Sequence, residues 1–73
     1  MVTLSIIILN YNAKGVVIDS IKSIEKHYAK DVESGEFEVI VTDNKSTDGS
    51  LEAFHEHKKT SKIKTFHIID NKG

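Results

Sequence analysis

Two short polar segments hold most of the residues that could bind a small molecule. The first, residues 10–12, places Tyr11 between the amides of Asn10 and Asn12. A flat base could stack on the tyrosine ring while the amides hydrogen-bond to its edge or hold the backbone. The tyrosine could equally cap the end of a sheet, with the asparagines making local turn bonds. The residue types and their spacing leave both interpretations open.

The second segment, residues 43–50, is rich in carboxylate, amide and hydroxyl groups. Asp43 and Asn44 come directly after an apolar run, where one side chain can point to a ligand and the other can bond nearby backbone. The following residues 46–50 (STDGS) are explained as a helix start, because their oxygens can accept hydrogen bonds from free backbone amides. Asp48 would also lie favourably against the positive end of that helix. Asp43 and Asn44 are not explained in this way.

Several other chemistries find little support. No G-x-G-x-x-G follows the first apolar run and no G-K-S/T is present, so neither a dinucleotide turn nor a P-loop can form. His55 and His57 lie two apart on a predicted helix and point to different sides, which disfavours metal chelation. We expect packed or solvent-facing roles for His27 and His67. The lysine-rich residues 58–64 could touch an anionic membrane but are better explained as a solvated loop.

The composition limits the possible classes further. With 73 residues, of which 38% are apolar, the chain can form one small domain with a marginal core. Its net charge of -1 and its lack of arginine argue against a dedicated nucleic-acid-binding domain. The absence of cysteine excludes disulfides and thiolate metal sites and leaves the redox compartment undetermined, and a cytoplasmic location is the default expectation. No apolar run is long enough to span a bilayer and no secretory signal pattern occurs.

The elements that must position the two segments are visible as periodic patterns. Apolar, β-branched runs predict strands at residues 3–9, 37–42 and 63–69. The first run is almost continuously apolar, as expected of a strand buried on both faces between layers of helices. Apolar residues at helical spacing predict one helix over residues 14–30 and another from about Leu51 to Lys59. An acidic connection is expected between the first helix and the second strand, closed by Gly35.

The order of these elements predicts an α/β fold. The pattern is a three-layer, Rossmann-like half, β-α-β-α-β, with parallel strands in the order 3-2-1. Ligands of such sheets lie beyond the carboxyl ends of the strands, which selects residues 9–12, 43–48 and 70–73. The last of these is expected to be a turn. We expect the chain to be part of a larger domain, with an exposed first strand that permits self-association.

The same segments resemble a known family. Residues 5–12 (SIIILNYN) resemble the first strand and turn of family 2 glycosyltransferases with the GT-A fold, whose usual form is Ser, three Ile or Val, Pro, any residue, Tyr and Asn. Residues 39–50 (VIVTDNKSTDGS) resemble that family's second strand and its V-D-D/N-x-S-T-D-G-S/T turn. Residues 71–73 (NKG) are similar to the start of its N-x-G stretch. The three matches occur in the family's order and cover nearly the whole chain.

The resemblance implies transfer of a sugar, with inversion, from a nucleotide-diphosphate donor to a saccharide or lipid-linked acceptor. It implies that Leu9, Tyr11 and Asn12 line the base pocket, with Tyr11 stacking on the base. Asp43 and Asn44 would bond to the base or support the residues that do. Residues 1–73 would be the amino-terminal nucleotide-binding part of the GT-A domain.

The family's D-x-D motif, which holds Mg²⁺ or Mn²⁺, and its catalytic base would lie beyond residue 73, so the chain alone is expected to be inactive. Leu9 replaces a common proline and Asn44 replaces a frequent second aspartate. The two motifs with these residues, L-N-Y-N and D-N, are similar to those of the rhamnosyltransferase-like branch of the family. UDP-linked and dTDP-linked donors are therefore both expected. The family also implies polysaccharide biosynthesis for the cell envelope, at the cytoplasmic face of a membrane.

A different class of protein is the main alternative. A noncatalytic receiver-like or flavodoxin-like module would have the same topology and would use Asp43 as a regulatory carboxylate. A receiver-like site needs further carboxylates after the first strand, where this chain has Asn10 and Asn12. The sequence therefore favours the glycosyltransferase.

Overall fold

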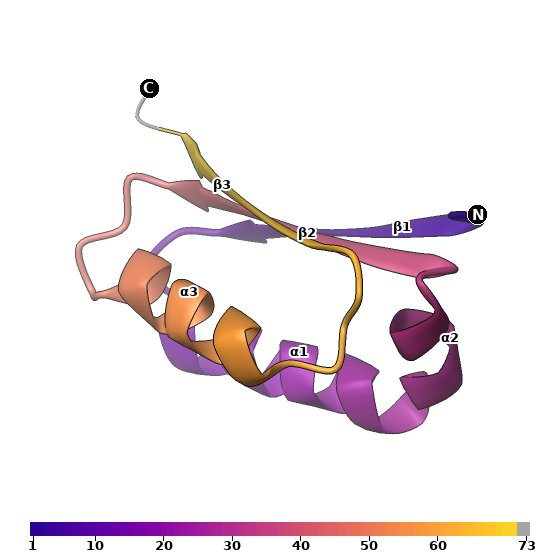
Figure 1. The fold of residues 1–73 in the computed structure, drawn as a ribbon. Coiled ribbons are helices and arrows are strands. Elements are labelled where there is room, and N and C mark those ends of the chain that lie inside the picture. The colour runs from indigo at the N-terminus through magenta and orange to yellow at the C-terminus, as the bar shows by residue number, and fades with distance from the viewer. Residues whose placement is uncertain (72–73) are drawn as a thin grey trace.

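The computed structural model describes residues 1–71 and shows a parallel sheet packed against a layer of helices (Figure 1). The elements, in chain order, are β1 (Leu4–Asn10), α1 (Lys14–His27), α2 (Ala29–Ser34), β2 (Phe37–Asn44), α3 (Ser50–Thr60) and β3 (Phe66–Asn71). The predicted α/β class is confirmed, with one short helix, α2, added to the first crossover. No helix within residues 1–71 is long and apolar enough to cross a membrane.

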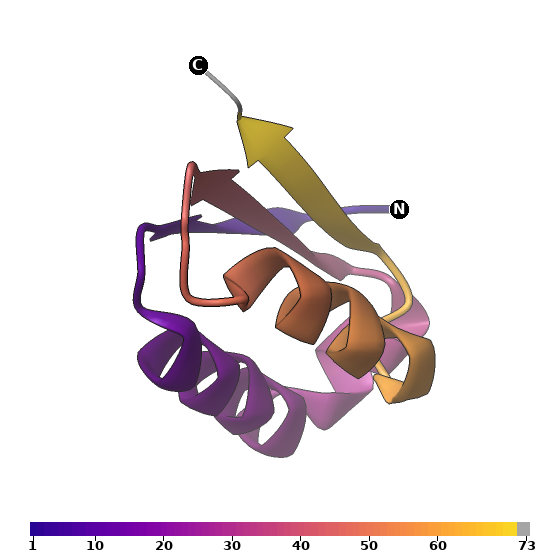
Figure 2. The same ribbon diagram turned by 90° about the vertical axis from the view of Figure 1, so that its left-hand side faces the viewer.

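The three strands are parallel, and β2 lies between β1 and β3. The predicted 3-2-1 order of neighbouring strands is therefore confirmed. The pairing of β1 with β2 runs from Leu4 opposite Phe37 to Asn10 opposite Asp43. The two segments singled out in the sequence therefore leave the sheet side by side. Figure 2 shows that their loops descend from the same edge of the sheet to α1 and α3.

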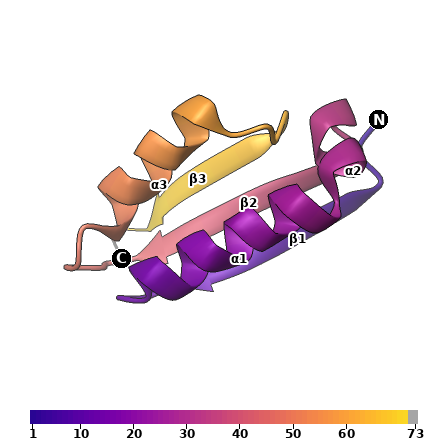
Figure 3. The same cartoon turned by 90° about the horizontal axis from the view of Figure 1, so that it is seen from below.

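All three helices pack on one face of the sheet, as Figures 1 and 3 show from two directions. Between the layers lies one apolar core, formed by Val17, Ile21, Val32, Val39, Val41, Phe54, Ile63 and Phe66. Ile6 and Ile8 of β1 pack against this core, whereas Ile7 and Leu9 are 64% and 78% exposed. The expectation that the first strand is buried on both faces is therefore wrong for residues 1–71, because helices cover only one face.

Element boundaries differ from the predictions in two places. The first helix ends at His27, and the expected acidic connection contains α2, which places Val32 in the core and ends at Gly35 in the left-handed conformation (φ 86°). The third strand begins only at Phe66 and continues to Asn71, because Asp70 and Asn71 pair with the end of β2. These two residues are therefore not the turn that we expected. Residues 72 and 73, which belong to the same prediction, lie outside the described residues.

Candidate functional site

A buried polar cluster joins the carboxyl ends of β1 and β2. Asn10 and Asp43 are only 1% and 3% exposed. The Asn10 side-chain amide donates to Asp43 Oδ1 at 2.7 Å and to Ser46 Oγ at 3.0 Å, and Asp43 Oδ2 accepts from the Ser46 backbone N–H at 3.2 Å. Asn10 Oδ1 accepts from the Ala13 N–H at 3.2 Å. The cluster thus fixes the turn after β1 to the turn after β2.

The Asp43 carboxylate is stabilised in its charged form. Burial raises the pKa of Asp43, but hydrogen bonds from the Ser46 hydroxyl, the Asn10 amide and the Ser46 backbone together lower it by more, so that the pKa lies below its ordinary value. Both oxygens of Asp43 accept hydrogen bonds from the protein itself. In this structure the side chain joins the turn after β1 to the turn after β2.

Asn12 extends the connection between the two turns. Its side-chain oxygen accepts from the Thr47 N–H at 2.7 Å, and its own backbone N–H donates to Ser46 Oγ at 2.9 Å. Asn12 also adopts a left-handed backbone conformation (φ 49°), which asparagine tolerates better than most residues. The side chain predicted to line a base pocket therefore shapes the turn that carries Tyr11.

Asp48 binds the amino termini of two helices at once. Its Oδ2 accepts from the Lys14 N–H at the start of α1, at 3.2 Å, and its Oδ1 accepts from the Ser50 N–H at the start of α3, at 3.0 Å, and from the Ser50 hydroxyl. The Ser50 hydroxyl contributes most to lowering the pKa of Asp48, burial opposes it, and the two backbone N–H groups lower it further. The predicted helix start is confirmed, and the bond to α1 is an addition. Both helix termini thus already face a carboxylate, which leaves little attraction for a phosphate there.

The exposed residues of this edge include Leu9, Tyr11, Asn44 and Lys45. Tyr11 is 66% exposed and directly follows Asn10, while Asn44 directly follows the opposite residue, Asp43. Lys45 has a left-handed backbone (φ 58°), a conformation that costs energy in a residue other than glycine and that is frequent at binding sites. An aromatic ring, an amide and an ammonium group are therefore presented to solvent at one edge.

The structure thus divides the five predicted site residues into two groups. The side chains of Asn12, which is exposed, and Asp43, which is buried, make hydrogen bonds that shape the loops. Leu9, Tyr11 and Asn44 are exposed. The sequence allowed a local turn bond for Asn10, which it makes with the Ala13 N–H, but did not reveal the contacts of Asn10 with Asp43 and Ser46 in the second polar segment. The position of Asn10 could have been found from its strand parity, because it follows Ile6 and Ile8 at intervals of two on the face toward the helices.

The divalent metal implied by the family resemblance has no fitting ligands in the described part of the chain. Residues 1–71 contain no group of three or more His, Asp or Glu side chains that could hold a metal ion. The Asp43 and Asp48 carboxylates are occupied by N–H and O–H donors. His57 and His67 each lie near one carboxylate, that of Glu25 at 2.9 Å and that of Glu38 at 3.8 Å.

A parallel α/β sheet of Rossmann-like type, with exposed polar and aromatic residues at its carboxyl edge, defines the class of this protein. Among protein families, the model of glycosyl transferase family 2 matches residues 5–73, a range that contains both edge segments. The chain therefore belongs to glycosyl transferase family 2. Searches of curated proteins and of solved structures give no significant match.

Proposed function

We propose that this chain is the amino-terminal, nucleotide-binding part of a sugar-nucleotide-dependent glycosyltransferase, with the base stacked on Tyr11. The observation that supports it best is the hydrogen-bonded cluster of Asn10, Asp43 and Ser46, which fixes the exposed Tyr11 at the sheet edge where parallel α/β folds bind ligands. Family membership supports a nucleotide-sugar donor in general.

The geometry favours contacts with the base side of the donor over contacts with its diphosphate. Asp43 and Asp48 place two carboxylates at this edge, and Asp48 occupies the amino termini of α1 and α3. A diphosphate would be repelled by these two charges, and the exposed Lys45 supplies one cation at this edge that partly offsets them. Metal ligands and a catalytic base are proposed to lie outside residues 1–73, so this chain alone would bind nucleotide without transferring a sugar.

The finer specificity rests on the family resemblance and on Asn44. Its side-chain oxygen can accept the N3 hydrogen that uracil and thymine share, so both UDP-linked and dTDP-linked sugars fit. The L-N-Y-N and D-N sequences support a rhamnosyl or hexosyl donor of the rhamnosyltransferase-like branch. A saccharide or glycolipid acceptor at the cytoplasmic face of the cell envelope completes the proposal.

The receiver-like alternative is less well supported. A regulatory carboxylate must be accessible to its modifying partner, whereas Asp43 is almost fully buried and both of its oxygens accept internal hydrogen bonds. The exposed aromatic ring of Tyr11 has no role in that alternative.

Calorimetric titration of the chain with UDP, dTDP and ADP tests the proposal. We expect a pyrimidine nucleotide to bind more tightly than ADP, and Tyr11→Ala to lose about 1–3 kcal/mol of binding free energy through lost stacking. Tyr28→Phe is the matched control, because it keeps the contact of that ring with Phe37, 5.7 Å between centroids, outside the carboxyl edge. Equal binding of the three nucleotides, or unchanged binding by Tyr11→Ala, would contradict the proposal.

A further inference from the structure

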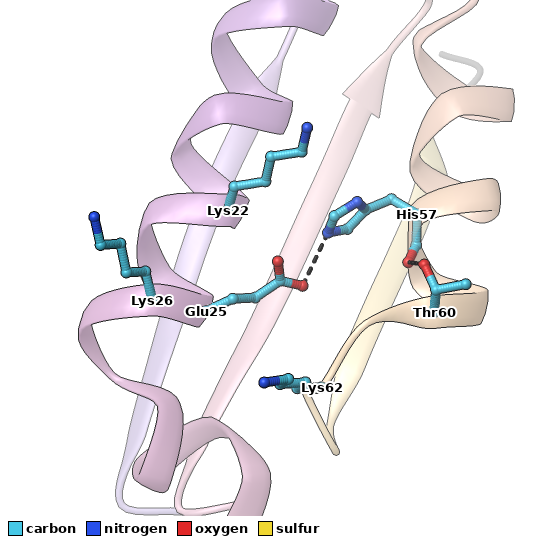
Figure 4. Close-up of a pocket in the computed structure, with 6 residues that line it drawn as sticks. All are labelled: Lys22, Glu25, Lys26, His57, Thr60 and Lys62. Carbon is cyan, nitrogen blue, oxygen red and sulfur yellow. Dashed lines mark hydrogen bonds and ion pairs between the residues drawn. The ribbon is translucent and has the colours of Figure 1, made fainter.

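A pocket between α1 and α3 gathers positive charge on the helical layer (Figure 4). Its volume is about 290 Å³, and it is lined by Lys22, Glu25, Lys26, His57, Thr60 and Lys62. Lys22 and Lys26 lie one turn apart on α1, and Lys62 belongs to the segment after α3. In Figure 4 the Lys22 and Lys62 side chains extend into the space between the two helices, and Lys26 lies at its margin.

The one carboxylate of this pocket is already bound by other groups. Glu25 Oε2 lies 2.9 Å from His57 Nε2 and also accepts a hydrogen bond from the Ser61 hydroxyl. Glu25 and His57 are both partly buried and point toward each other across the gap between the helices (Figure 4). This contact joins α1 to α3 and lies between the Lys22 and Lys62 side chains (Figure 4).

The three lysines have no such partner in the described part of the chain. No carboxylate of residues 1–71 lies within 4.0 Å of the ammonium groups of Lys22, Lys26 or Lys62. Two cations, Lys22 and Lys62, therefore lie in the gap with a single, hydrogen-bonded carboxylate, although the whole chain has a net charge of -1. Positive charge concentrated in a concave surface raises the local concentration of anions.

The chemistry of lysine indicates which anion fits. Each ammonium group is a compact charge with three donors and no preferred plane, so several of them can surround a tetrahedral oxyanion. Hydrogen bonds between charged partners are also stronger than those between neutral groups. A phosphate group with two negative charges would offset the surplus that Lys22 and Lys62 create.

The pocket is separate from the edge that carries Tyr11. The first residue of α1, Lys14, lies at that edge through its bond to Asp48, and Lys22 follows eight residues later. At 1.5 Å per helical residue, this places Lys22 about 12 Å farther along α1. A ligand in the pocket would therefore not occupy the proposed base site.

We propose that the pocket between α1 and α3 binds a phosphate dianion or phosphate monoester through Lys22 and Lys62, with Lys26 contributing at the margin. The phosphate group can belong to a small molecule or to a lipid headgroup, since the same two ammonium groups would hold either. This binding does not depend on the proposed nucleotide site.

The test is an amide NMR titration of the chain with inorganic phosphate at constant ionic strength. We expect weak, saturable binding with shifts centred on Lys22, Glu25, His57 and Lys62. The double variant Lys22→Gln/Lys62→Gln should weaken binding about two- to fivefold for each lysine removed. Lys30→Gln, an exposed lysine on α2 outside the pocket, is the matched control and should leave the affinity unchanged.

Vesicles of phosphatidylcholine with and without phosphatidic acid separate the two sources of phosphate. Cosedimentation that requires phosphatidic acid and is lost in the double variant would support a headgroup ligand, while binding of free phosphate alone would support a small molecule. Shifts spread over all lysines, or wild-type affinity in the double variant, would overturn the proposal. Tyr11→Ala should bind phosphate as the wild type does, which separates this result from failure of the nucleotide site.

Discussion

Replacement of Asp43 by alanine tests whether this side chain holds the carboxyl edge together. In the native chain its two oxygens accept from Asn10 Nδ2 and from the Ser46 N–H. Without them, one hydrogen of the Asn10 amide loses its acceptor at a position that is 1% exposed, where water cannot replace it. The Ser46 N–H is partly buried and can be solvated more easily.

The expected cost follows from these contacts. A buried donor without a partner costs about 1–3 kcal/mol, and the loss of hydrogen bonds to a charged acceptor places the variant in the upper part of that range. We therefore expect Asp43→Ala to lower the free energy of unfolding by about 2–3 kcal/mol. For a domain of this size, 1 kcal/mol corresponds to about 4–8 °C in Tm, so the melting temperature should fall by roughly 8–24 °C.

Urea unfolding followed by circular dichroism measures this difference. Asn44→Ala is the matched control, because the neighbouring side chain is exposed and should change the free energy of unfolding by no more than about 0.5 kcal/mol. If Asp43→Ala were no less stable than Asn44→Ala, the structural role assigned to Asp43 would be refuted.

Two further predictions concern pH and association. The pKa values of Asp43 and Asp48 are lowered in the folded chain, so the unfolded chain binds more protons in acid. The stabilisation from the two carboxylates is complete above their unfolded pKa of about 3.9 and is lost as the pH falls through their pKa values in the folded chain. The urea concentration at the unfolding midpoint should therefore decrease from pH 6 toward pH 3. An unchanged midpoint would contradict this prediction. Exposed Ile7 and Leu9 on β1 predict concentration-dependent sedimentation that Ile7→Lys reduces, whereas a monomer at every concentration would argue against self-association.

The order of the elements could be predicted because apolar periodicity is local information. Alternation along β2 places Val39, Val41 and Asp43 on one face, and that pattern alone could have indicated that Asp43 is buried. The sequence could not show that β1 has an uncovered face, because a continuous apolar run conceals which residues meet the helices. The α2 helix was missed for a similar reason, since it is held by burial of Val32 and not by a long periodic pattern.

In the candidate site, too, contacts between residues close in sequence were predictable and contacts between distant residues were not. The bond between Asp48 and Ser50 spans two residues and agrees with the capping pattern in the sequence. The bonds from Asp48 to Lys14 and from Asn12 to Thr47 join residues more than thirty positions apart and depend on how α1 and α3 dock. The position of Tyr11 just after the first strand was predicted, whereas the hydrogen bond from the Thr47 N–H to the Asn12 side chain, 35 residues away, was not.

Intermolecular nuclear Overhauser effects test the central claim most directly, because they report contact between the Tyr11 ring and a bound base. The chain would be isotope-labelled, mixed with UDP or dTDP, and compared with Tyr28→Phe so that signals from the two tyrosines are assigned separately. We predict contacts from the Tyr11 ring protons to the pyrimidine H6 and to the C5 substituent of at least one nucleotide. Contacts found only at other sites, or shifts that leave Tyr11 and Asn44 unchanged at saturation, would contradict the account.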